Sequence, residues 1–149
     1  MHLGVEATRM VGDWRGIGRY TRQLLRHFAR LRPELRLTLY TDSRDQFATL
    51  VGELAPLGYG PERSGVAMVR ALKSDPPQLI WYPWNRTKHF SRAAHMVVTV
   101  HDLAPFHFRY RSWLRQGLQR KIERRFRESA ERADLIITDS AHSADPTRR

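Results

Sequence analysis

Short apolar runs and longer stretches with helical spacing alternate along this chain. The short runs are typical of strands that a sheet buries, and they predict strands at residues 3–7, 35–41, 79–82, 96–100 and 135–138. The longer stretches predict helices at residues 17–32, 43–54, 66–73 and 112–133. Because strands and helices alternate, we expect βαβ units and therefore an α/β fold, a parallel sheet with helices on both faces.

The first and last of these helices combine an apolar face with a basic one. The apolar positions are Ile17, Tyr20, Leu24, Phe28 and Leu31 in the first helix, which Pro33 ends, and Leu114, Leu118, Ile122, Phe126 and Ala130 in the last. We expect these side chains to face the sheet. Asp42 or Ser43 is expected to cap the second helix. Residues 55–65, rich in proline and glycine, predict a loop with a short strand at residues 57–59.

The composition is that of one folded domain. The chain has 149 residues, of which 41% are hydrophobic and 28% charged, close to the average of globular proteins. It contains no apolar run long enough to span a membrane and no secretion signal at its N-terminus. It also has no cysteine, which excludes disulfides and thiolate metal sites and fits a reducing compartment. We therefore expect a cytoplasmic domain.

The net charge is the first feature that suggests a partner. A formal charge of +11 attracts polyanions, phosphates and anionic lipid surfaces. One alternative is a nucleic-acid-binding domain that uses the arginine-rich stretch 111–132, but glutamates interrupt this stretch and no nucleic-acid motif is present, so we expect no nucleic acid. Peripheral contact of the basic helix faces with an anionic membrane is a second alternative, and a solvated helix face is a third.

Glycine and polar residues follow three of the predicted strands, at the edge where parallel sheets bind ligands. Gly16-Ile17-Gly18-Arg19 opens the first helix, where free N–H groups suit either a phosphate or a structural turn. Tyr82-Pro83-Trp84-Asn85 and His101-Asp102 follow two later strands and combine groups that suit sugar-like ligands, although core packing or local hydrogen bonding would explain each residue separately. The histidine spacing fits no common zinc site, so no metal is expected.

Three ordered motifs resemble the N-terminal domain of family 4 glycosyltransferases. They are Gly16-Ile17-Gly18-Arg19-Tyr20-Thr21-Arg22-Gln23-Leu24-Leu25, Val97-Val98-Thr99-Val100-His101-Asp102-Leu103 and Ala133-Asp134-Leu135-Ile136-Ile137-Thr138-Asp139-Ser140. The resemblance implies one half of a GT-B fold, in which two Rossmann-like domains face each other across a cleft. It also implies bacterial glycan biosynthesis, with transfer of a sugar from a nucleotide-sugar donor to a glycan or lipid-linked acceptor and retention of the anomeric configuration.

The resemblance assigns roles to individual residues. Gly16, Gly18 and Arg19 would lie close to the donor's diphosphate and the acceptor. His101 would be the catalytic residue that contacts the donor sugar. The rest of the substrate-binding set would be Trp84 and Asn85 on the acceptor side, Asp102 in the loop of His101, and Ser140, which is also an expected helix cap. Because the imidazole's partner would be the sugar, we expect His101→Ala to change the stability of this chain little.

A second domain would be needed for activity. The family's basic pair and its two-glutamate motif belong to a C-terminal, donor-binding domain, which these 149 residues do not contain. Pro146 would also interrupt the helix expected after Ser140, so the sequence predicts a domain truncated near its end. We expect it to be inactive alone, because a diphosphate leaving group needs charge stabilisation. No cofactor is expected beyond the nucleotide-sugar co-substrate. A non-catalytic binding module and the acceptor subunit of a split transferase remain alternatives.

Overall fold

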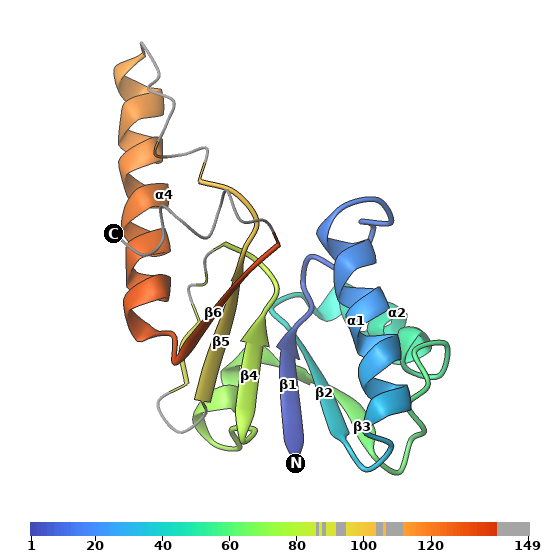
Figure 1. Ribbon diagram of the computed structural model, residues 1–149. Coiled ribbons are helices and arrows are strands. Elements are labelled where there is room, and N and C mark those ends of the chain that lie inside the picture. Colours follow the sequence, from blue (N-terminus) through green and yellow to red (C-terminus); the bar gives the residue numbers. More distant parts are fainter. Residues whose placement is uncertain (86, 88, 92–94, 104–105, 107–111, 140–149) are drawn as a thin grey trace.

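The computed structural model describes residues 1–85, 87, 89–91, 95–103, 106 and 112–139. This part of the chain forms a sheet of six strands: β1 (His2–Glu6), β2 (Arg36–Thr41), β3 (Ser64–Met68), β4 (Leu79–Tyr82), β5 (His95–Val100) and β6 (Leu135–Thr138). All neighbouring strands are parallel, in the order β3-β2-β1-β4-β5-β6 (Figure 1). The predicted parallel α/β architecture is confirmed.

The helices cover different halves of the sheet on opposite faces. On one face, α1 (Ile17–Leu31) and α2 (Phe47–Leu54) lie over the half that contains β1, β2 and β3, and α4 (Trp113–Arg132) packs on the other face (Figure 1). Two short 3-10 helices, η1 (Arg44–Gln46) and η2 (Val69–Lys73), complete the connections. Right-handed crossovers explain the arrangement, because the chain crosses the sheet in one direction through β2 and β3 and in the other through β5 and β6.

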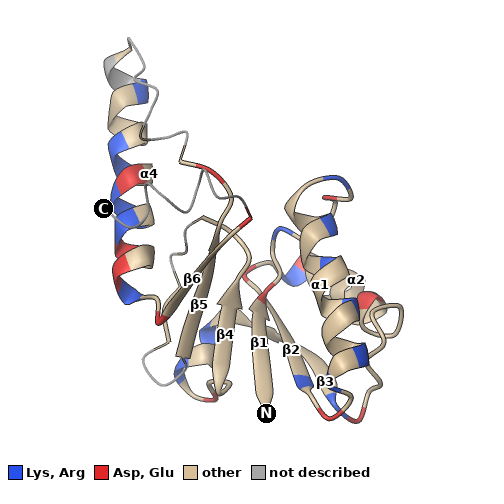
Figure 2. Cartoon of the chain, viewed as in Figure 1, with Lys and Arg blue, Asp and Glu red and all other residues tan. Residues whose placement is uncertain are grey.

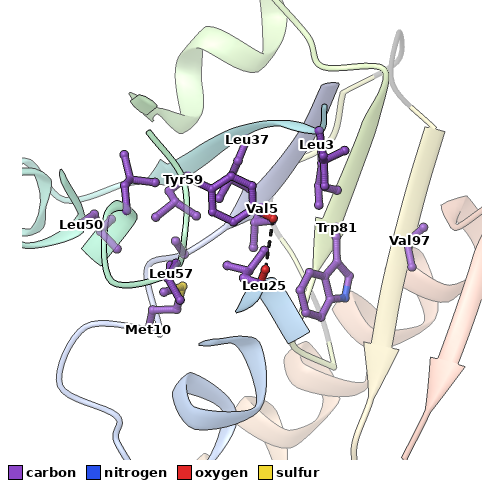
Figure 3. Close-up of a cluster of buried hydrophobic side chains, with 14 residues drawn as sticks. Leu3, Val5, Met10, Leu25, Leu37, Leu50, Leu57, Tyr59, Trp81 and Val97 are labelled. Atoms are coloured by element: carbon purple, nitrogen blue, oxygen red, sulfur yellow. Dashed lines mark hydrogen bonds between the residues drawn. The ribbon is translucent and has the colours of Figure 1, made fainter. Parts of the chain in front are cut away.

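Alternate residues of each strand supply two separate cores. On the α1 side the buried strand residues include Val5, Leu37, Leu39, Trp81 and Val97 (Figure 3). On the α4 side they include Ile80, Tyr82, Met96, Val98 and Val100, which pack with Phe126 of α4. The central strands are therefore apolar on both faces, as the near-continuous apolar runs predicted.

The region between α2 and β4 differs from the prediction. The strand expected at residues 57–59 is a turn in which Gly58 has a φ of 90° and Leu57 and Tyr59 are buried, each 1% exposed. The helix expected at residues 66–73 is instead β3 followed by η2. Pairing of β3 along the whole of β2, from Leu37 opposite Ser64 to Thr41 opposite Met68, overrides the weak local helical pattern.

Two smaller expectations also need correction. Ser43 precedes η1, but its side chain makes no capping hydrogen bond; its backbone N–H donates instead to Thr41 Oγ1 at 3.1 Å. Leu31, in the last turn of α1, is 74% exposed, and Leu118 of α4 is 60% exposed rather than packed on the sheet. For Leu118 the reason is that α4 begins well beyond the strands and only its later turns lie alongside them (Figure 1). Phe126, two turns further on, is buried as expected.

One part of the sheet has no helix over it in the described structure. Beside α1, apolar side chains of β4, β5 and β6 border an open groove of about 390 Å³, which Leu24, Phe28 and Leu31 of α1 line from the other side. Leu135 and Ile137 of β6 remain 55% and 37% exposed there. The groove interrupts the layered packing that covers the rest of the strands.

Basic residues are concentrated on α4, as Figure 2 shows. Its exposed face carries Arg115, Arg120, Lys121, Arg124 and Arg132. None of the helices in the described ranges has the length and apolar character that crossing a membrane requires.

Candidate functional site

The carboxyl ends of the strands bring the sequence motifs to one edge of the sheet. The glycine motif opens α1 after the loop that follows β1, Trp84 and Asn85 follow β4, and His101 follows β5. Asp139 follows β6 at the same edge. Parallel strands all end on this side, which is why residues far apart in the sequence meet here.

The N-terminus of α1 is occupied by a carboxylate of its own loop. Asp13 Oδ1 accepts hydrogen bonds from the backbone N–H groups of Arg15 at 3.1 Å and Gly16 at 2.8 Å, and Oδ2 accepts one from Gly18 at 3.1 Å. The bonds from Gly16 and Gly18 hold the pKa of the Asp13 carboxyl below its usual value, so it stays anionic. The glycine motif therefore holds an internal anion at the helix N-terminus, where the sequence left a phosphate and a structural turn as alternatives.

Gly18 is required by the close approach of this loop. A Cβ at this position would lie 2.0 Å from the carbonyl oxygen of Asp13, a distance that no side chain permits. Gly18 is also buried, whereas Gly16 and Arg19 are exposed. The motif thus contains one residue with a demonstrable packing role, and two that face solvent.

A buried arginine fixes the same loop to α2. The Arg22 side chain is 3% exposed and forms a two-point ion pair with Glu53, with nitrogen–oxygen distances of 2.8 and 2.6 Å. Its remaining donors bind the carbonyl oxygens of Asp13 and Met10, both at 2.8 Å. This Arg22–Glu53 clamp pairs the two charged groups with each other and fixes the loop between β1 and α1 against α2.

The imidazole of His101 has protein partners on both ring nitrogens. Nδ1 lies 2.9 Å from Asp139 Oδ2, and Nε2 lies 3.2 Å from the carbonyl oxygen of Pro83. The ring of Tyr20 in α1 packs edge to face against the imidazole, with the two ring centres 5.1 Å apart. The His101 side chain is only 14% exposed. Both polar partners are acceptors, so a neutral imidazole can donate to one of them and an imidazolium to both. The structure therefore gives His101 the local hydrogen bonds that the sequence left open as an alternative to a ligand-binding role.

Asn85 joins the ends of β4 and β5. It is 6% exposed, its Oδ1 accepts the His101 N–H at 2.7 Å, and its Nδ2 donates to the Asp102 carbonyl at 3.2 Å. The carboxylate of Asp102 itself belongs to an exposed residue. Asn85 thus positions the backbone of His101 and Asp102, and the acceptor-side place that the resemblance implies for it stays a prediction.

Two expected site residues remain, Trp84, which the structure describes, and Ser140, which it does not. Trp84 is half-buried, and the guanidinium carbon of Arg9 lies 3.9 Å from the centre of its ring. Ser140 lies outside the described residues. No group of three or more histidine, cysteine, aspartate or glutamate side chains in the described part of the chain is arranged to hold a metal ion.

Sequence reasoning missed the residues that hold the site together. Asp13, Arg22 and Glu53 are charged residues on a polar loop, a basic helix face and a short helix, where solvent exposure is the usual outcome. The one available signal was Asp13, because an aspartate just before a helix, here three residues before the N-cap Gly16, can accept from the free N–H groups.

Comparison with known proteins addresses the identity of this domain. The family model described as Glycosyltransferase Family 4 matches residues 14–149, nearly the whole chain. No curated protein and no solved structure gives a significant match. The matched region includes the end of the loop before α1, the helix itself and every later strand, and its parallel α/β fold is that of one half of a GT-B enzyme. The chain therefore belongs to glycosyltransferase family 4, as a domain of the N-terminal GT-B type.

Proposed function

We propose that this domain forms the acceptor side of the cleft in a retaining glycosyltransferase that uses a nucleotide-sugar donor. The observation that carries the proposal is the meeting of the glycine motif, Asn85 and His101 at the carboxyl edge of the sheet, within a chain of family 4. In this proposal Gly16 and Arg19, both exposed, face the donor and the acceptor across the cleft. His101 contacts the donor sugar with its exposed edge.

The electrostatics of the edge support a division of labour between two domains. A departing diphosphate must be met by positive charge or by free N–H groups. At the N-terminus of α1 the Asp13 carboxylate already takes the N–H groups of Gly16 and Gly18. Arg22, although nearby, already forms an ion pair with Glu53 and donates hydrogen bonds to two carbonyl oxygens. We therefore assign stabilisation of the leaving group to a separate donor-binding domain.

The test uses residues 1–149 alone and joined to a donor-binding domain of the same family. Both proteins are incubated with a panel of nucleotide sugars and glycan or lipid-linked acceptors, and release of nucleoside diphosphate is measured. We expect release only from the joined protein, with a product whose anomeric configuration, read by NMR, matches that of the donor. Turnover by residues 1–149 alone would contradict the division of labour, and an inverted product would contradict the retaining mechanism.

A further inference from the structure

A second polar region lies at the same edge, beyond the residues of the motifs. It is a pocket of about 220 Å³, here called the edge pocket, whose charged and aromatic lining consists of Glu6, Arg9, Asp42, Trp84, His89 and Arg125. These side chains come from the end of β1 and the loop after it, from the residue after β2, from the segment after β4, and from α4. The volume is below the roughly 300–1,000 Å³ of pockets for drug-sized ligands, so the edge pocket suits a single ring.

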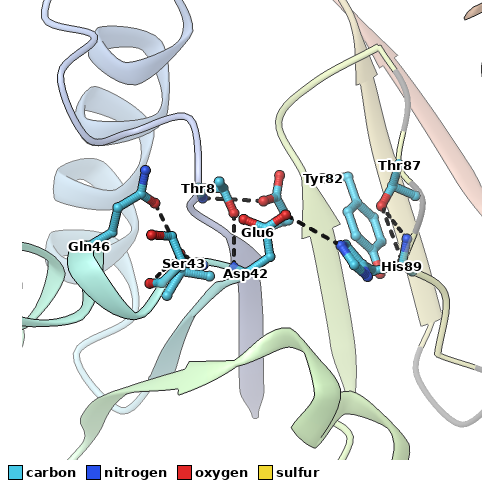
Figure 4. Close-up of polar contacts among 9 residues, drawn as sticks. Glu6, Thr8, Asp42, Ser43, Gln46, Tyr82, Thr87 and His89 are labelled. Atoms are coloured by element: carbon cyan, nitrogen blue, oxygen red, sulfur yellow. Dashed lines mark hydrogen bonds and ion pairs between the residues drawn. The ribbon is translucent and has the colours of Figure 1, made fainter.

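The walls of the edge pocket are held by hydrogen bonds within the protein (Figure 4). On one side, the Thr8 N–H donates to Glu6 Oε1 at 3.2 Å, and the Asp42 N–H donates to Thr8 Oγ1 at 3.3 Å. On the other side, the hydroxyl of the buried Tyr82 donates to the carbonyl of His89. The pocket is therefore part of the folded framework.

Further contacts attach the segment after β4 to the helix that closes the pocket. The Thr87 N–H donates to Ser129 Oγ of α4 at 2.9 Å, and the His89 N–H donates to Thr87 Oγ1 at 3.0 Å. His89 Nε2 lies 3.7 Å from Asp42 Oδ2, which links this segment to the end of β2 (Figure 4). Arg125 lines the pocket from the same helix that Ser129 anchors.

The charges of the lining select against most ligand classes. Two carboxylates and two guanidinium groups balance, so neither an anion nor a cation gains a net attraction from the pocket. An anion would face Glu6 and Asp42, and a cation would face Arg9 and Arg125. A neutral molecule with several hydroxyl groups can donate to the carboxylates and accept from the guanidinium groups at the same time.

Trp84 adds a donor that folding leaves unsatisfied. Its Nε1 is buried and has no hydrogen-bond partner in the structure as described, and buried donors of this kind are rare in folded proteins. This atom is shielded even from water, so Trp84 lines the pocket with other atoms of its side chain and its N–H does not itself face the cavity.

We propose that the edge pocket binds one neutral pyranose ring of the acceptor through its hydroxyl groups. The preference for a neutral, hydroxyl-rich ring stands on the pocket itself, whereas its identity as part of an acceptor rests on the function proposed above. Glu6 and Asp42 accept from the sugar hydroxyls, Arg9 and Arg125 donate to them, and the Trp84 side chain borders the ring. The residues of the pocket thus determine which acceptor is used, and take no part in the chemical step.

The experiment measures binding of single sugars to this chain by ¹H–¹⁵N NMR. The chain has four tryptophans, and the indole signal of Trp84 is assigned by its loss in Trp84→Phe. Methyl pyranosides of the gluco, galacto and manno series are titrated in parallel with inorganic phosphate, a sugar 1-phosphate and glucosamine. We expect at least one methyl pyranoside to shift the Trp84 indole signal saturably at millimolar concentration, with little dependence on salt.

Matched pairs of variants locate the binding. Asp42→Asn and Arg125→Gln are each expected to weaken binding about tenfold or more. Their controls, Asp45→Asn and Arg124→Gln, change exposed residues of the same type outside the pocket and are expected to have no effect. Glu6→Gln is a further test, because it keeps the shape of the side chain while removing the charge.

Two results would overturn the proposal. One is tighter binding of inorganic phosphate or the sugar 1-phosphate than of every neutral pyranoside, which would make the pocket an anion site. The other is the absence of any shift of the Trp84 signal by neutral pyranosides up to the limit of solubility. Neither result bears on sugar transfer by the joined protein, so failure of the pocket and failure of the proposed function are separable.

Discussion

The β1–α1 loop and the edge pocket lie at the same edge of the sheet, yet they use their polar groups in opposite ways. In the loop, Asp13 binds three backbone N–H groups, and Arg22 places its donors on Glu53 and two carbonyl oxygens. In the pocket, carboxylates and guanidinium groups line a cavity, although Glu6 also accepts from the Thr8 N–H and Asp42 lies 3.7 Å from His89, and the indole N–H of Trp84 has no partner among the described residues. A motif can thus mark the rigid support of a site, while ligand contacts come from neighbouring residues.

The comparison predicts opposite effects of substitution on stability. Groups whose hydrogen bonds are satisfied inside the protein stabilise the fold, whereas groups held ready for a ligand contribute little or are unfavourable in its absence. Substitutions in the loop should therefore lower the free energy of unfolding strongly, and substitutions in the pocket should not.

The largest effect is expected for Arg22→Met. This change leaves Glu53, whose side chain is 12% exposed, without its buried partner, and removes the donors that hold two loop carbonyls. Loss of one member of a buried ion pair costs about 3–5 kcal/mol, to be measured by urea denaturation. Arg19→Met, at an exposed position of the same helix, is the control and should cost less than about 0.5 kcal/mol. Equal effects of the two changes would show that the clamp does not stabilise the loop.

An intermediate effect is expected for His101→Ala. The sequence analysis expected almost no change, but the structure places both ring nitrogens on protein acceptors and Tyr20 against the ring. Because Asp139 is 42% exposed and can be hydrated once the imidazole is lost, we expect a cost of only about 1 kcal/mol, or roughly 2–4 °C in Tm.

The control for His101 is His95→Ala, which removes a side chain that is 80% exposed from the start of the same strand. It should leave Tm unchanged. If His101→Ala also leaves Tm unchanged, the imidazole is held only by a bound ligand, and the earlier expectation stands.

The smallest effect, and the one of opposite sign, is expected for Glu6→Gln. Burial raises the pKa of the Glu6 carboxyl, so its ionised form is unfavourable in the folded state. The variant should therefore melt about 1–3 °C higher than the parent at pH 7. As pH falls through the raised pKa toward the ordinary value of 4.5, Glu6 becomes protonated in the folded protein and the advantage should vanish.

The measurement is Tm of both proteins from pH 8 to pH 4. The titration of Asp13 does not affect the comparison, because Asp13 is present in both proteins and its contribution cancels in the difference of their Tm values. A variant that is less stable than the parent at pH 7 would show that attraction between Glu6 and Arg9 outweighs the cost of burial.

Most of the fold could be predicted because its central strands have unambiguous patterns. The apolar runs of β4 and β6 were located to the residue, and β1, β2 and β5 to within one residue at either end. At β3 the local pattern is weak, since Ser64, Gly65 and Ala67 have little strand preference and only pairing with β2 decides their conformation. The prediction for Leu118 was wrong for a related reason, because helical periodicity shows which face of a helix is apolar but not where the sheet ends.

The candidate site could be predicted only in outline. The sequence shows which motifs follow strands, and so which residues share an edge. It does not show that Asn85 turns toward the backbone of His101, or that Asp13 reaches back to Gly18, because both depend on hydrogen bonds between separate segments. Glu6 and Asp42 of the pocket have no motif, although each stands at or just after the end of a strand.

The groove beside α1 has a consequence for the thermodynamics of the whole domain. Leu135 and Ile137 are already 55% and 37% exposed in the folded state, so unfolding transfers less new apolar surface to water than in a sheet covered on both faces. The heat-capacity change of unfolding rises with that newly exposed area and is typically about 12–15 cal/mol/K per residue. For this chain it should be smaller, and the free energy of unfolding should vary less steeply with temperature on both sides of its maximum.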